Sequence, residues 1–340
     1  MLPLALSLSA ILVLEHLLSF VFRILIGLLA TISPLAAPFV GSVAGADGDP
    51  SQEHSHAPMI VRSRPVIERL PLKVIQPIDL TATETGHLFV ADRSGSIVFR
   101  IDPEHRADAV ARQIADLSRV TAHRLGIYCL TSNGRSGSVI QLTETGHQSQ
   151  PVYLNFAPAG LAVNEVGDLY IGNSDHAEII RLRRSGDLWE RQHVQVATAV
   201  RDVRAEKSGR VVALLENGSV ISLSDADNVR HEGWVPASTT RLAIHPQDGI
   251  LAVGLEDTLQ PYLYRLTQNR QQSVRYASLP EGTVAVAFDR LGNLASANPD
   301  LRAVTRVTSR FEVPCPHCGQ RVPMILSPHA PVAPARRRSF

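Results

Sequence analysis

A glycine recurs about every forty residues along this chain, each time between two short apolar segments. Successive glycines lie 40, 41, 42, 40 and 43 residues apart, at Gly86, Gly126, Gly167, Gly209, Gly249 and Gly292. A repeat of this length that reads as strand, turn and strand is typical of a β-propeller, in which each repeat forms one four-stranded blade. Glycine suits the first turn because a tight or bulged hairpin needs a positive φ there. The sequence therefore predicts an all-β, six-bladed β-propeller of four-stranded blades.

The two ends of the repeat array complement one another. The sixth repeat has three strand-like segments, TVAVAFDR, NLASAN and AVTRVT, and reaches Pro314 before a fourth. The stretch VIERLPLKV at 66–74, ahead of the first repeat, resembles outer-strand text such as VRYASLP at 274–280. We predict that residues 65–71 form the outer strand of the last blade, because this closes the ring and leaves neither terminal blade unpaired.

The amino terminus is apolar and precedes the repeats. Residues 1–46 contain only Glu15, His16 and Arg23 as chargeable side chains, and the small residues at 44–46 resemble a signal-peptide cleavage site. The same apolar helix is also long enough for an uncleaved membrane anchor. Both readings predict an exported protein, periplasmic, extracellular or anchored to the membrane by this segment. A flexible linker at 47–64, the propeller at 65–312 and a mostly disordered, irregular tail at 313–340 complete the expected organisation.

Charge and cysteine content exclude some functions. Lysine and arginine together number 33, and aspartate and glutamate 32, which gives a net charge of +1. This balance provides no positive field to attract nucleic acid, so we expect no nucleic-acid partner. We also expect the propeller to be monomeric. Three cysteines are too few for a scaffold built on disulfides. The sequence contains no Gly-x-Ser-x-Gly elbow, phosphate loop or His-Glu-x-x-His motif.

Two repeats resemble a known family. The phrases PAGLAVNEVGDLYIGNS and AFDRLGNLASAN, and less closely PIDLTATETGHLFVADRSG, look like NHL repeats, and the resemblance covers about residues 65–310. NHL propellers are mostly binding platforms, whereas the distantly similar gluconolactonase/senescence-marker and strictosidine-synthase-like propellers include enzymes. The gluconolactonase-like enzymes hold a divalent cation at the central channel, with one asparagine ligand in a Pro-Asn-Gly phrase. The corresponding phrase here is Pro158-Ala159-Gly160, whose alanine supplies no ligand oxygen, and this argues against metal-dependent hydrolysis.

The start of each innermost strand should line the mouth of the axial channel. These positions are Asp79, Arg119, Gly160, Asp202, Arg241 and Ala285. Alternating acids and arginines suit ion pairs between neighbouring blades, or the binding of a small polar or anionic ligand. We therefore take Asp79, Arg119, Asp202 and Arg241 as the candidate ligand-binding residues and identify no catalytic residue. A second set lies six places after the repeat glycine and is expected to cap the following turn: Asp92, Ser132, Asn173 and Asn298.

The carboxyl-terminal tail contains one short metal-like motif. Cys315 and Cys318 in Cys-Pro-His-Cys-Gly resemble half of a zinc knuckle, which His317, His329 or a second chain would have to complete. In an oxidising compartment the same pair can form a disulfide, and an idle tail is the third possibility. No other cofactor is indicated.

The favoured function is that of an exported, non-catalytic propeller that binds a protein, peptide or glycan through its loop face. The alternative is a lactonase-like or other hydrolase with a ligand at the central channel. A membrane partner is expected only if the amino-terminal segment is uncleaved.

Overall fold

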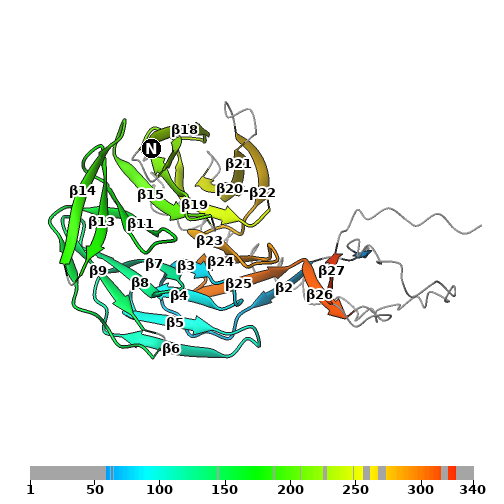
Figure 1. Ribbon diagram of the computed structural model, residues 1–340. Helices are drawn as coiled ribbons and strands as arrows, with labels where there is room; N and C mark the ends of the chain where they lie inside the picture. The colour runs from blue at the N-terminus through cyan, green and yellow to red at the C-terminus, as the bar shows by residue number, and fades with distance from the viewer. Residues whose placement is uncertain are drawn as a thin grey trace, which may run out of the picture. The chain divides into compact units, whose positions relative to one another are not determined.

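Six four-stranded antiparallel sheets form the body of the protein (Figure 1). The computed structural model describes residues 59–326 apart from 62, 64, 144, 187, 207, 225–227, 248, 256–260, 267–272 and 315–320. The expected amino-terminal helix and its cleavage site lie outside the described residues. The glycine in the turn after the first strand of each blade has a positive φ, from 78° at Gly249 to 135° at Gly126. The backbone requirement inferred from the repeat is therefore confirmed.

The strands follow the repeat closely. The first three blades are β3 (Pro77–Ala82), β4 (Leu88–Asp92), β5 (Ile97–Ile101) and β6 (Ala107–Arg112); β7 (Leu117–His123), β8 (Gly126–Ser132), β9 (Gly137–Leu142) and β10 (Val152–Leu154); and β11 (Pro158–Val163), β12 (Leu169–Asn173), β13 (Glu178–Ser185) and β14 (Leu188–Gln195). The fourth and fifth are β15 (Val200–Ala205), β16 (Val211–Leu215), β17 (Ser219–Leu223) and β18 (Val229–Trp234); and β19 (Thr239–His245), β20 (Gly249–Leu255), β21 (Pro261–Leu266) and β22 (Ser273–Ser278).

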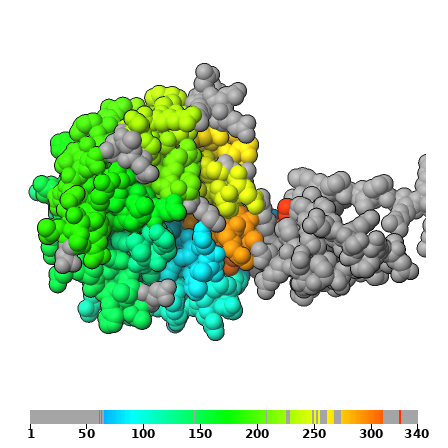
Figure 2. Space-filling model, viewed as in Figure 1, coloured from blue at the N-terminus to red at the C-terminus, as the bar shows by residue number. Residues whose placement is uncertain are grey.

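The last blade confirms the predicted ring closure. It consists of β23 (Ala285–Phe288), β24 (Leu294–Asn298), β25 (Ala303–Thr308) and, as its outer strand, β2 (Val66–Arg69) from the amino-terminal side of the array. Strand β2 pairs antiparallel with β25, from Val66 opposite Thr308 to Arg69 opposite Thr305. The first strands of successive blades contact one another around the whole ring, and β23 returns to β3. Figure 2 shows the result on the surface, where the cyan first blade lies beside the orange last blade.

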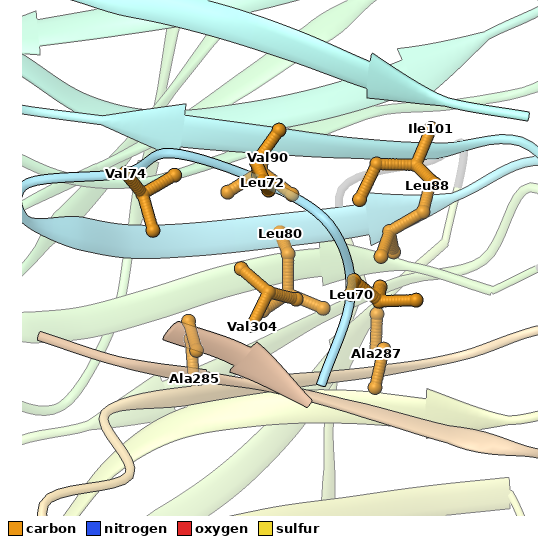
Figure 3. Packing of buried hydrophobic residues seen from close by; sticks show 12 residues of the cluster. Leu70, Leu72, Val74, Leu80, Leu88, Val90, Ile101, Ala285, Ala287 and Val304 are labelled. Atoms are coloured by element: carbon orange, nitrogen blue, oxygen red, sulfur yellow. The ribbon is translucent and has the colours of Figure 1, made fainter. Parts of the chain in front are cut away.

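The hydrophobic core lies between the blades. Six clusters of buried side chains each combine residues of two neighbouring sheets, so each interface of the ring has its own core. The cluster between the last and first blades also contains Leu70, Leu72 and Val74, which follow β2 and pack onto Leu80 and Val304 (Figure 3). The segment that closes the ring therefore also contributes to the core between the last and first blades, and burial of its apolar side chains stabilises the closure.

A separate three-stranded sheet was not predicted from the sequence. Strand β1 (Met59–Val61) pairs parallel with β27 (Arg321–Leu326), which pairs antiparallel with β26 (Arg310–Pro314). These strands fall in or near segments expected to be a linker and an irregular tail. Each of these two segments offers only a short apolar run, MIV at 59–61 or RVPMIL at 321–326, and the partner lies at the other end of the chain.

Candidate functional site

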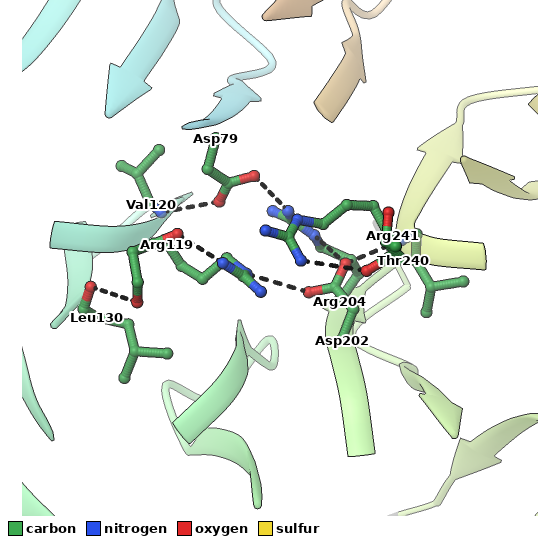
Figure 4. Close-up of polar contacts among 10 residues, drawn as sticks. Asp79, Arg119, Val120, Leu130, Asp202, Arg204, Thr240 and Arg241 are labelled. Atoms are coloured by element: carbon green, nitrogen blue, oxygen red, sulfur yellow. Dashed lines mark hydrogen bonds and ion pairs between the residues drawn. The ribbon is translucent and has the colours of Figure 1, made fainter. Parts of the chain in front are cut away.

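A bulge at one repeated place aims side chains into the channel. In five of the six innermost strands, β3, β7, β11, β15 and β19, the pairing register with the second strand shifts near the start. Such an extra residue bends the strand and redirects the side chain that follows. Asp79, Arg119, Asp202 and Arg241 each come directly after the shift. The structure thus brings all four predicted site residues to the same end of the ring of inner strands (Figure 4).

The two aspartates hold neighbouring blades together. Both are fully buried, with 0% of their surface exposed. Asp79 Oδ2 accepts the Val120 N–H of the next inner strand at 3.0 Å, and Asp202 Oδ2 accepts the Leu242 N–H at 2.8 Å. The same bond is made twice, from the first blade to the second and from the fourth to the fifth. The aspartates therefore stabilise the inner ring through backbone groups of the neighbouring blade, which the sequence prediction of ion pairs did not include.

Arg204 is a central residue that the sequence analysis missed. Its guanidinium donates to Asp79 Oδ1 at 2.5 Å, across the channel, and to Asp202 Oδ2 at 3.3 Å on its own strand. A signal existed in the sequence. Position 204 is two residues beyond Asp202, on the same strand face, where the other five repeats have only threonine or alanine: Thr81, Thr121, Ala162, Ala243 and Ala287.

Arg119 and Arg241 are bonded less completely. Arg119 is buried and lies 3.6 Å from Asp202, measured from Nε to Oδ1, while its Nη1 donates to the Ser118 carbonyl at 2.7 Å. Arg241 is half-buried, and its Nη1 donates to the Thr240 carbonyl at 3.1 Å. In both arginines the Nε atom is buried without a hydrogen-bond partner among the described residues. These two guanidinium groups therefore each retain a donor that the described residues leave unused.

The pKa shifts reflect this crowding of charge. Burial and then the neighbouring charge of Arg241 lower the pKa of Arg119 to about 9, against the opposite effects of Asp202 and Asp79. For Asp202, burial alone would raise the pKa, but the charges of Arg204, Arg119 and Arg241 together with the Leu242 N–H lower it. Burial likewise opposes charge on Arg204, yet Asp202 and Asp79 raise its pKa. Asp202 and Arg204 are therefore held in their charged forms.

Gly160 is the third blade's counterpart of these residues, and the packing explains why it has no side chain. A Cβ added there would lie 2.1 Å from the Val203 backbone nitrogen and 2.7 Å from the Asp202 carbonyl carbon. The inner strands β11 and β15 approach one another too closely for any larger residue. The neighbouring Ala159 is buried and contributes no polar side-chain atom.

The predicted turn-capping residues are confirmed. Each accepts a hydrogen bond from a backbone N–H of the turn that follows it: Asp92 from Gly95, Ser132 from Gly134, Asn173 from Asp175 and His176, and Asn298 from Leu301. Asp92 additionally accepts the N–H groups of Ile75 and Gln76 at 2.8 Å each, which fixes the entry into β3. These side chains stabilise loops.

Solved structures of other proteins have a similar fold. Virginiamycin B lyase from Staphylococcus aureus aligns over 72% of this chain and 99% of its own, at 11% identity and a TM-score of 0.53. A gluconolactonase from Xanthomonas campestris aligns over 72% and 95%, at 13% identity and 0.54. The chain is a six-bladed propeller, distantly similar to the gluconolactonase-like propellers.

The fold is also similar to that of a chain from a multiprotein complex. A chain of the Mitotic Checkpoint Complex aligns over 82% of this chain and 99% of its own, at 11% identity and a TM-score of 0.55. At such identities the likeness concerns the fold alone. No protein-family model matches the sequence, and no curated protein matches it, so the NHL resemblance stays a prediction.

The metal and membrane predictions are not tested by the part of the chain that the structure describes. Cys315, His317, Cys318 and His329 lie outside the described residues. Within the described ranges no three histidine, cysteine, aspartate or glutamate side chains gather as a metal would require, and no helix there has the length and hydropathy of a membrane span. Cys129 is buried as a free thiol whose pKa burial raises.

Proposed function

We propose that this chain is an exported, non-catalytic propeller that binds a protein, peptide or glycan through its loop face. The observation that supports this is the state of the channel carboxylates. Asp79 uses one oxygen for Val120 N–H and the other for Arg204, and Asp202 Oδ2 receives both Leu242 N–H and Arg204. The fourth oxygen, Asp202 Oδ1, is buried without a hydrogen-bond partner among the described residues and lies 3.6 Å from Arg119 Nε. A general base or a metal ligand needs accessible oxygen lone pairs, and three of these four oxygens are used in structural contacts while the fourth is buried beside a guanidinium group.

Hydrolysis is the alternative, favoured by the gluconolactonase among the similar folds. A single experiment separates the two. The purified full-length chain, in mild detergent, is analysed for bound divalent metal and is incubated with a panel of lactones and esters. We expect neither stoichiometric metal nor turnover. Metal uptake or lactone hydrolysis that disappears in Asp202→Ala, while a folded spectrum is retained, would establish the hydrolase instead.

Binding itself is tested on peptide and glycan arrays with the same full-length protein. Saturable binding to one chemical class, competed by the free peptide or glycan, is the expected result. An absence of saturable binding on both arrays, under conditions where the protein is folded, contradicts the proposal. Export is tested separately by fractionation of cells that express the full chain, with removal of residues 1–46 as the control that should stay in the cytoplasm.

A further inference from the structure

The channel cluster contains more positive than negative charge. Three guanidinium groups, Arg119, Arg204 and Arg241, face two carboxylates, Asp79 and Asp202, and all five come from inner strands β3, β7, β15 and β19. Of the three guanidinium groups, Arg204 makes the shortest contact to each carboxylate. The remaining contact, from Arg119 Nε to Asp202 Oδ1, is 3.6 Å long and outside hydrogen-bond geometry, so that both atoms are buried without a hydrogen-bond partner among the described residues. One positive charge therefore has no carboxylate of its own within the described cluster.

The excess charge lies on Arg119 and Arg241. Arg119 is buried, with 10% of its side chain exposed, and its Nε has no hydrogen-bond partner among the described residues. Arg241 has the same unpartnered, buried Nε, and its Nη1 donates to the Thr240 carbonyl. Buried donors without acceptors are unfavourable, and the positive charges of Arg119 and Arg241 repel one another. The pKa of Arg119 is lowered first by burial and second by the charge of Arg241, which agrees with this geometry.

We propose that Arg119 and Arg241 bind the carboxylate of a small organic acid at the channel mouth, a step that rests on the proposed binding function. A carboxylate brings one negative charge, which matches the excess, and two acceptor oxygens for the unused N–H donors. Arg119 and Arg241 reach the centre from opposite sides of the ring in Figure 4. The half-buried Arg241 is the solvent-facing member, so the acid enters from its side.

The test uses the full-length chain in nonionic detergent at low salt, with D-glucuronate as the carboxylate probe, neutral D-glucose as its uncharged counterpart and inorganic phosphate as a second oxyanion. Binding is measured by titration calorimetry. We expect saturable binding of glucuronate, none of glucose, and binding about tenfold or more weaker in Arg241→Gln, because a charged hydrogen bond is lost. Arg112→Gln, an exposed arginine on the outer strand β6, is the matched control and should bind like the parent.

Each other outcome overturns the proposal. These are no saturable glucuronate binding, equal binding of glucose, undiminished binding in Arg241→Gln, or an equal loss in Arg112→Gln. Tighter binding of phosphate than of glucuronate would overturn the carboxylate assignment. Arg241→Lys, which keeps the charge and loses the planar pair of donors, guards against misfolding and should bind with intermediate affinity. Failure here leaves the proposed binding function intact, because that function is contradicted by lactone turnover or by blank arrays.

Discussion

At the scale of single residues, Arg204 holds the channel cluster together. Its guanidinium joins Asp79 and Asp202, which are 0% exposed and which also accept backbone N–H groups from neighbouring blades. A buried charge that loses its partner is strongly destabilising, whereas an exposed pair contributes little. The contribution of Arg204 to stability can therefore be separated from that of a surface arginine.

We expect Arg204→Met to lower the free energy of unfolding by about 3–5 kcal/mol, because it leaves the two buried carboxylates without their strongest partner. The matched control is Arg183→Met. Arg183 pairs with the buried Asp168 at 3.5 Å but is 54% exposed, so we expect a loss of at most about 1 kcal/mol. Urea unfolding measures both. Equal losses in the two variants would mean that the channel pair contributes no more than a surface pair.

Asp202 should make stability depend on acid pH. Burial alone would raise its pKa, but Arg204, Arg119 and Arg241 hold the pKa below the ordinary 3.8. A carboxyl whose pKa is lower in the folded state contributes stability that is complete above the unfolded pKa and is lost as the pH falls through the folded one. We expect the unfolding free energy of the parent to fall more steeply below pH 3.8 than that of Asp202→Asn. Parallel curves would contradict this assignment.

At the scale of elements, the inner strands and the closing strand were predictable, because each depends on a pattern that repeats. The glycine period located the hairpins, and the missing fourth strand of the last repeat pointed to 65–71. Arg204 was not predicted because only its own blade has a charged residue there. The bulges were missed because a register shift is a property of two paired strands, and the sequence of one strand does not show which residue of its partner lies opposite. The sheet of β1, β26 and β27 was missed because its strands pair from opposite ends of the chain.

The ring closure gives a prediction with a built-in control. Leu70 is 3% exposed and belongs to the core between the last and first blades, whereas Ile67 on β2 is 72% exposed. We expect Leu70→Ala to cost about 2–5 kcal/mol and Ile67→Ala to stay within about 0.5 kcal/mol of the parent. Denaturant unfolding of the full chain measures the difference. Similar values for both would show that closure does not depend on the buried part of this segment.

At the scale of the whole molecule, six interfaces with separate cores share one inner ring of polar contacts. An exported chain enters an oxidising compartment, where cysteines tend to form disulfides. We expect a thiol assay on the denatured, unreduced protein to find one thiol, that of Cys129, with Cys315 and Cys318 joined. Three thiols accompanied by one equivalent of zinc would favour the knuckle, and three without zinc an idle tail. The Cys315→Ser variant identifies the pair.

The position of β2 also sets an order of events during synthesis. Arg69 at the end of this strand bonds the carbonyl of Leu301, 232 positions further along the chain. The ribosome makes β2 before any blade and β25 after nearly all of them. Strand β2 therefore has no pairing partner until the sixth repeat has been made. Pairing over such a separation forms slowly, because the entropy of closing a long loop is lost before the stabilising contacts between the strands form. The first five blades contain only strands of their own repeats, but the propeller becomes a ring only after the sixth repeat has been made and has paired with β2.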